Sequence, residues 1–375
     1  MTNLFEQCLI FHAIGDIIGF YNGHREFNTS IPVSKETTRY MVDEVILNGG
    51  ISRMNLEGYM VSDDTMMHQA TARALLKDNG DIKNFIDILR KEYIYLLKDP
   101  KFEHRAYGLT TIESLKLLKS GTITKIPYQS EKKGNGACMR VSCIGVAFAG
   151  EKNRSKLITY ALESARLTHN SATGMLSAIT VALFTAFACE QVNLLDWPYN
   201  MLAIVKDDYI SNYIKKTRPE DYENYQRDKY HFIDAWERYC KIRISTNVVE
   251  KELIEKKTLH ILTERVKWIY DNFNPNRFNK NSSDGRFLKD TGSTGEDGPI
   301  FAYESLLTTV SYGRNSWETL CYLSMIHAGD SDTVGAMAAA WYGVFNKLYK
   351  TNVIFAEKQE IIELSKELVK KFSNF

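Results

Sequence analysis

Four consecutive oxygen-bearing side chains, Ser62, Asp63, Asp64 and Thr65, offer the clearest chemistry in this sequence. The residues that follow, 66–76, place apolar side chains at helical spacing, so the four lie at the expected first turn of a helix. Ser and Asp are preferred helix caps, and a capping side chain stabilises a helix by roughly 0.5–2 kcal/mol. Taken alone, residues 62–65 are therefore explained as a helix cap.

A second cluster of the same type changes this interpretation. Asp330, Ser331, Asp332 and Thr333 open another helical run, the small-residue stretch 334–343. One cap needs one acceptor, whereas the two helix starts together hold four carboxylates and several hydroxyls. Carboxylates gathered in one place repel each other unless a cation or shared protons offset their charge. We therefore expect the two helix starts to meet around a cation.

The ligand types indicate which cation this is. Carboxylate and hydroxyl oxygens are hard ligands that suit Mg²⁺, Mn²⁺ or Ca²⁺. Two-metal hydrolytic sites hold their ions about 3.5–4 Å apart. We expect the two helix starts to hold two such ions, with these ligands: Ser62, Asp63, Asp64, Asp330, Asp332 and Thr333.

Helical spacing of apolar residues continues along the rest of the chain, and no convincing alternating β pattern interrupts it. Besides 62–76, the expected helices cover 3–20, 40–47, 82–97, 110–118, a stretch opening at 134, 153–169, 171–189, 194–213, 222–242, 249–273, 300–310, 317–327, the stretch after 330, and a terminal stripe ending at Phe372. This pattern predicts an all-α fold, a single compact orthogonal multi-helix domain of about a dozen helices over residues 1–375. The irregular segments 20–60, 120–136 and 274–299 are where we expect the site.

Glycines mark two places where backbones are expected to come close to another group. Gly15 and Gly19 lie four residues apart on one face of the first helix, which lets a neighbouring backbone approach. Gly134, Asn135 and Gly136 leave backbone N–H groups uncovered at an expected helix start. Such groups suit a phosphate or ribose oxygen.

Composition excludes several classes of function. The chain of 375 residues carries 47 Lys and Arg against 46 Asp and Glu, a net charge of +1. This balance offers no electrostatic footprint for nucleic acid or for an anionic membrane, so a small molecule or a protein is the expected substrate. The six cysteines show no CxxC spacing and nothing resembles a signal peptide, which predicts reduced thiols and a cytoplasmic location.

The segment 170–189 holds no charged residue and is long enough to raise a transmembrane interpretation. Asn, Ser and Thr residues interrupt it, and no basic flank marks one side. We therefore expect a central core helix there.

Six blocks of this sequence, in this order, resemble the ADP-ribosylglycohydrolase family, and in particular its ADP-ribosylarginine hydrolase branch. The blocks are AIGDIIGFYNGHREF, VSDDTMMHQATARAL, GNGACMRVSCIGVAF, ESARLTHNSATG, TGSTGEDGPIFAYESLL and HAGDSDTVGAMAAAWYG. The resemblance covers nearly the whole chain. It implies an all-helical protein with two Mg²⁺ ions that hydrolyses the bond between the ADP-ribose C1″ atom and a modified side chain.

The resemblance also implies roles for single residues. The metal ligands of the family fall on the six residues given above, none of which is missing. Glu26 matches an acidic loop residue near the metals, whereas Tyr107 stands where the family pattern has a proline. The residues implied to line the substrate cleft are Gly108, Asn135, Gly136, His169, Ser293, Thr294, Gly295 and Asp297.

The mechanism we expect is attack of a water on the ribose C1″ atom, with Asp63 or Asp64 accepting the water proton. Glu26 or Asp297 then faces the cationic leaving group, because a guanidinium keeps its proton at any working pH. The catalytic residues of this hypothesis are Asp63, Asp64 and Glu26. The expected partners are ADP-ribose and ADP-ribosylated proteins, and the protein is expected to act as a monomer.

Three other functions remain open at this point. The same fold and metals serve to cleave ADP-ribosyl-serine or O-acetyl-ADP-ribose in another branch of the family. A protein that binds ADP-ribose without turnover would resemble the degenerate members of the family, although those have lost part of the ligand set. A Mg²⁺-dependent phosphohydrolase would need Arg or Lys beside the acids, and none is adjacent to either cluster in the sequence.

Overall fold

The computed structural model describes residues 3–25, 34–245, 260–278, 286–311, 315–348 and 353–373. In these ranges the chain forms sixteen α-helices and no β-strand, and the one β-type pairing is an isolated bridge between Gly134 and Thr294. The predicted all-α fold class is therefore confirmed, with somewhat more helices than the dozen expected.

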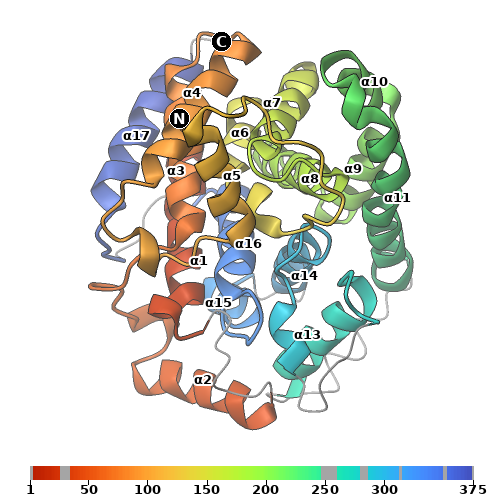
Figure 1. Ribbon diagram of the computed structural model, residues 1–375. Coiled ribbons are helices and arrows are strands. Elements are labelled where there is room, and N and C mark those ends of the chain that lie inside the picture. The colour runs from red at the N-terminus through yellow and green to blue at the C-terminus, as the bar shows by residue number, and fades with distance from the viewer. Residues whose placement is uncertain are drawn as a thin grey trace.

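Figure 1 shows the arrangement of the helices. Their bounds are α1 Leu4–Phe20, α2 Lys35–Leu47, α3 Asp63–Lys77, α4 Ile82–Leu96, α5 Leu109–Ser120, α6 Ser142–Ala147, α7 Arg154–Arg166, α8 Ala172–Cys189, α9 Trp197–Lys206, α10 Asp208–Thr217, α11 Tyr222–Tyr239, α13 His260–Phe273, α14 Asp297–Ser311, α15 Trp317–Ser324, α16 Ser331–Phe345 and α17 Lys358–Phe372.

Three helices, α1, α8 and α16, are apolar on nearly every face, and almost all of their side chains are buried. A helix that is hydrophobic all round belongs in the centre of a protein, and here α16 packs along both α1 and α8. α1 and α8 are also long and apolar enough to cross a bilayer, but 89% and 94% of their apolar windows are buried inside this fold. The expectation of a core helix at 170–189 is confirmed.

The contact between α1 and α16 is unusually close because glycines face each other across it. A Cβ atom added at Gly15 would lie 2.4 Å from the Gly335 carbonyl oxygen, and one at Gly19 would lie 2.1 Å from the Ser331 carbonyl oxygen. Backbone therefore touches backbone, as the spacing of the two glycines predicts. This contact brings the start of α16 against the end of α1, at the place where the site forms.

Several predicted helices are divided or shifted. The stretch 194–213 forms two helices, α9 and α10, because Asp207 is extended and its side chain caps α10 by accepting from the Tyr209 N–H. α11 ends at Tyr239 and continues as a π-helical turn, Cys240–Ile244. The helix expected to open at 134 is a 3₁₀ turn, Asn135–Ala137, followed by the short helix α6.

Two further boundaries differ from the expectation. α2 starts at Lys35 instead of near Tyr40, because the Ser34 side chain caps it through the Thr37 N–H. α14 starts at Asp297, inside the expected loop. The first part of the helix expected at 249–273 lies outside the described residues.

The close α1–α16 contact leads to a stability prediction. Gly15→Ala adds a methyl group where a carbonyl oxygen already lies, and such overpacking costs about 1–3 kcal/mol of unfolding free energy. Urea unfolding of the variant and the wild type measures this loss. Gly108→Ala is the matched control, since Gly108 has a φ of −61° and open space around its Cβ position. Equal stability of both variants would contradict the packing argument.

Candidate active site

The two acidic helix starts meet. The Thr333 Oγ1 hydroxyl on α16 lies 3.3 Å from Asp64 Oδ1 on α3, although the two residues are 269 positions apart. The four aspartates of the two starts, Asp63, Asp64, Asp330 and Asp332, are all buried. The spatial convergence that the sequence predicts is therefore present in the structure.

The same residues also cap their helices, so the structural interpretation and the site coexist. The Ser62 hydroxyl accepts from the Asp64 N–H at 3.1 Å, and Asp330 Oδ1 accepts from the Thr333 N–H at 3.3 Å. The Asp332 carboxylate accepts from that N–H at 2.8 Å. Free N–H groups and the helix dipoles favour negative charge at both starts, which offsets part of the repulsion among the carboxylates.

Gathering negative charge here is unfavourable, and the pKa values of the buried aspartates show this. Burial, followed by the neighbouring carboxylates of Asp16 and Asp330, raises the pKa of Asp63 well above its usual value. Burial also raises the pKa of Asp330. Among the described residues no ion pair involves Asp16, Asp63 or Asp330. The cluster therefore favours protons or a cation as its counter-charge.

Asp16 is a member of this cluster that the sequence interpretation missed. It lies on α1 without solvent exposure and accepts hydrogen bonds from the Ser62 and Thr65 N–H groups at 3.1 and 3.2 Å and from the Thr65 hydroxyl. Burial raises its pKa to about 6. The signal was available, because a carboxylate inside the apolar run 3–20 is rarely buried without a partner.

Arg105 is a second missed residue, and it fixes the other side of the same segment. Its carbonyl accepts from the Asp63 N–H at 2.8 Å, and its guanidinium donates to the Val61 carbonyl at 2.6 Å. The guanidinium also pairs with Asp99 at 2.7 Å and with Glu357 at 3.4 Å. Asp16 and Arg105 together hold the start of α3 in place. No local pattern in the sequence shows these contacts.

Asn135 contacts the acidic cluster directly. Its side-chain amide donates to Asp330 Oδ2 at 2.8 Å and to the Gly292 carbonyl at 2.9 Å. Its backbone N–H donates to the Ser293 carbonyl at 3.1 Å, so the expectation that this N–H is uncovered is wrong. The Asn135 N–H is hydrogen-bonded because residues 133–135 run beside residues 293–295. In the same pairing the Gly295 N–H donates to the Lys133 carbonyl at 2.8 Å.

Asp297 organises the loop that carries the other predicted ligand contacts. Its two buried oxygens accept from Gly292, from the Thr294 N–H and hydroxyl, and from the Asn274 amide. Burial raises its pKa to about 6. Both carboxylate oxygens already accept hydrogen bonds from Asn274, Gly292 and Thr294, so Asp297 holds this loop together.

His169 lies beneath the glycine turn that the sequence predicts as a nucleotide contact. A Cβ atom on Gly136 would lie 2.8 Å from His169 Cε1, so the glycine is needed for the close approach of this ring. Burial, and then the charge of Arg140, lowers the pKa of His169 to about 3, which keeps the ring neutral. Gly108 is exposed, and its backbone is among the groups that act on the pKa of Asp63. Glu26 lies outside the described residues.

The donor set matches a hard divalent cation in chemistry, since carboxylate and hydroxyl oxygens dominate it. Within the described ranges, no group of three or more His, Cys, Asp or Glu side chains is arranged so that it could hold a metal ion. Asp330 and Asp332 accept hydrogen bonds here, from the Asn135 amide and from the Thr333 N–H respectively. The two-ion arrangement stays a prediction.

The fold is all-α, and its two acidic helix starts converge on a cluster of buried carboxylates. A family model described as ADP-ribosylglycohydrolase matches residues 2–350, so the chain belongs to the ADP-ribosylglycohydrolase family. The resemblance noted in the sequence is thereby confirmed. Members of this family are hydrolases that act on ADP-ribosyl glycosidic bonds.

Individual proteins agree with this assignment. A protein of Acanthamoeba polyphaga mimivirus with the provisional name ADP-ribosyl glycohydrolase is 35% identical over 365 residues, which are 96% of this chain and 67% of that protein. The ADP-ribosylhydrolase ARH1 of Dictyostelium discoideum is 30% identical over 381 residues, 97% of this chain and 93% of that protein. A solved ADP-ribosylglycohydrolase-related protein complex shares the fold, with a TM-score of 0.51, 16% identity and 98% coverage of both chains.

The contacts of Arg105 predict a large effect of its removal. Arg105→Met leaves the nearly buried carboxylates of Asp99 and Glu357 without their cation, and breaking such a pair costs about 3–5 kcal/mol. Chemical denaturation gives the free energy of unfolding. Arg39→Met is the control, because the Arg39–Asp43 pair lies on the surface of α2 with side chains 72% and 51% exposed, and such helix pairs contribute only about 0.3–0.5 kcal/mol. Similar losses in both variants would refute a special role for Arg105.

Proposed function

We propose that this protein removes ADP-ribose from mono-ADP-ribosylated arginine side chains by hydrolysing the N-glycosidic bond at the ribose C1″ atom. The observation that carries the proposal is the convergence of the α3 and α16 starts, which gathers a complete set of carboxylates in a buried cluster. The similarity to ARH1 of Dictyostelium discoideum and the sequence blocks of the arginine branch support the choice of arginine.

Two Mg²⁺ ions are part of this proposal. The residues that would hold them are Ser62, Asp63, Asp64, Asp330, Asp332 and Thr333. When bound, such ions supply positive charge that can bind ribose hydroxyls and polarise a water. The raised pKa of Asp63 supports the idea that the cluster needs a cation to hold several ionised carboxylates at neutral pH.

The residues of the chain perform the remaining steps. Asp63 or Asp64 accepts a proton from the attacking water, and the base strength of Asp63 is increased by its buried position. The water oxygen bonds to C1″ as the bond from C1″ to the guanidine nitrogen breaks. The departing guanidine then takes up the proton and leaves as a guanidinium. Asn135 keeps Asp330 in place throughout, through its 2.8 Å hydrogen bond.

Glu26 is retained in the proposal as the acidic residue that faces the cationic leaving group. Asp297 is not assigned to this task, because its oxygens are engaged with its own loop. The monomeric state and the cytoplasmic location also remain proposals from the sequence.

Substrate preference separates the proposed function from its alternatives. We expect the protein with Mg²⁺ to release ADP-ribose from an arginine-modified peptide and to leave a serine-modified peptide intact. A chelator should abolish release, because it removes the cation that the carboxylates require. Free ADP-ribose is measured by chromatography with time. Release from serine alone points to the other branch, and binding of ADP-ribose without release from either peptide points to a non-catalytic protein.

The proton acceptor is tested by substitution. Asp63→Asn and Asp64→Asn should each lower kcat by at least about 10²-fold, the usual cost of losing a general base or a ligand beside it. Single-turnover release from the arginine-modified peptide measures the effect. Asp87→Asn, an exposed carboxylate on α4, is the control and should keep wild-type activity. Full activity of both site variants with Mg²⁺ present would end the assignment.

A further inference from the structure

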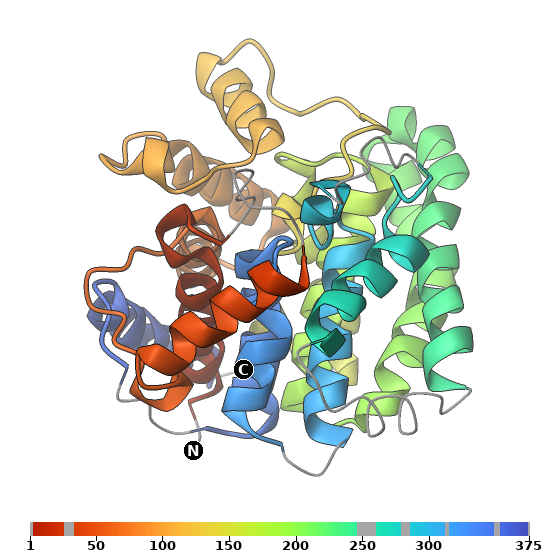
Figure 2. The ribbon, with the colours of Figure 1, turned by 90° about the horizontal axis from the view of Figure 1, so that it is seen from below.

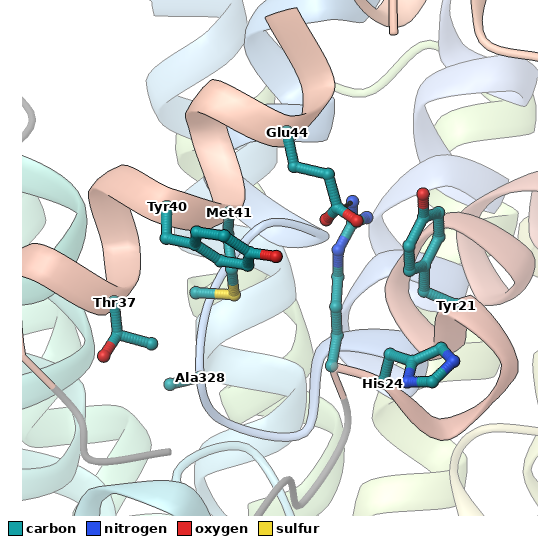
Figure 3. A pocket seen from close by; sticks show the side chains of 8 residues that line it. Tyr21, His24, Thr37, Tyr40, Met41, Glu44 and Ala328 are labelled. Atoms are coloured by element: carbon teal, nitrogen blue, oxygen red, sulfur yellow. Dashed lines mark ion pairs between the residues drawn. The ribbon is translucent and has the colours of Figure 1, made fainter. Parts of the chain in front are cut away.

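A cavity of about 320 Å³ lies between the end of α1 and the helix α2. In Figure 3 the side chains of Tyr40, Met41 and Glu44 enter it from α2, and Tyr21 lies on the opposite wall. Ala328, two positions before the acidic start of α16, also lines it. The cavity therefore borders the loop that precedes the start of α16, and its size is at the small end of ligand pockets.

The most unusual side chain in the cavity wall is Arg25. It is buried, it donates from Nη1 to the Ile18 carbonyl at 2.6 Å, and its guanidinium lies 4.0 Å from the centre of the Tyr21 ring. Among the residues that the structure describes, its Nε and Nη2 groups meet no acceptor at hydrogen-bond distance, and Nη2 has only the longer contact with the Glu44 carboxylate. A buried N–H without an acceptor is costly, so these groups favour an incoming acceptor oxygen.

The charge next to Arg25 decides which acceptor is suitable. The Glu44 carboxylate lies 3.6 Å from Arg25 Nη2, so the two groups together are close to neutral. A phosphate placed against Arg25 would be repelled by Glu44. A peptide group is neutral and carries both an acceptor and a donor, so its C=O suits Arg25 while an N–H suits Glu44. The pair thus matches polypeptide backbone better than the phosphates of ADP-ribose.

The outer surface of α2 also has the character of a protein-binding surface. Tyr40, Ile46 and Leu47 are 64%, 58% and 86% exposed on this one short helix. Tyr40 lines the cavity, and Ile46 and Leu47 lie further along the same helix. Scattered apolar side chains are normal on a surface, but three on one short helix mark a place where another protein can be contacted. Figure 2, seen from below, shows α2 lying across this end of the molecule.

From these observations we infer that the cavity bounded by Tyr21, Arg25, Tyr40, Met41, Glu44 and Ala328 binds main-chain peptide groups of the modified protein, beside the residue that carries the ADP-ribose. This inference rests on the proposed function, because it places the polypeptide on one side of the bond that is cleaved. It makes Tyr40 and Glu44 determinants of how well a protein substrate is bound.

The test compares two substrates that share the same scissile bond. One is the free amino acid conjugate, ADP-ribosylarginine, and the other is a peptide with an ADP-ribosylated arginine at its centre. Tyr40→Ala and Glu44→Ala should raise KM for the peptide by about 5- to 10-fold, the range of a significant interface residue. The kinetics with the free conjugate should stay within about twofold of wild type.

Two control variants test whether the effect on KM is specific to the cavity. Asp43→Ala changes an exposed carboxylate on the same helix, and Tyr230→Ala removes an exposed tyrosine, 55% exposed, on α11. Neither lines the cavity, so both should behave as wild type with either substrate. Tyr40→Ala is informative even where Glu44→Ala unfolds, since Tyr40 is mostly exposed.

The results that overturn the inference are distinct from those that overturn the proposed function. Unchanged KM for the peptide, or an equal rise for both substrates, means that the cavity does not select polypeptide. If the wild type cleaves neither arginine substrate, the proposed function is wrong, and the cavity is tested by binding instead. The modified peptide must then bind more tightly than free ADP-ribose, and only that advantage must be lost in the two cavity variants.

Discussion

The structure depends on the burial of several carboxylates in one place. Asp16, Asp63, Asp64, Asp330 and Asp332 come from three helices and are all removed from water. Such a cluster is unfavourable by itself, and the raised pKa values of Asp16 and Asp63, caused first by burial, show this. The helix starts offset part of the cost, because their free N–H groups hydrogen-bond to the carboxylates and their dipoles favour negative charge. What remains of the cost favours bound protons or a cation.

The helices around the cluster are built to maintain this arrangement. Gly15 and Gly19 let α1 lie directly against the backbone of α16, which fixes the distance between Asp16 and the second acidic start. Arg105 fixes the segment before α3 from the other side with its carbonyl and its guanidinium. Because the carboxylates come from three different helices, the site exists only when the whole core is assembled.

We propose that polypeptide and nucleotide are recognised on different sides of this core. The loop organised by Asp297 and the glycine turn above His169 form one side of the site, and they are joined by the pairing of residues 133–135 with 293–295. The cavity beside Arg25 and Glu44 forms another side, with balanced charge and exposed apolar side chains on α2. The first suits a nucleotide sugar, and the second suits the chain that carries it.

The sequence by itself determined the all-α class, the two acidic helix starts, the close approach at Gly15 and Gly19, and the resemblance to the ADP-ribosylglycohydrolase family. These features are local, since periodicity, capping residues and short motifs depend on neighbours along the chain. Only the tertiary structure showed Asp16 and Arg105 at the site, the engagement of the Asn135 N–H by Ser293, and the loop-holding contacts of Asp297. The partners in these contacts are set by how helices and loops pack, and no spacing in the sequence encodes that packing directly.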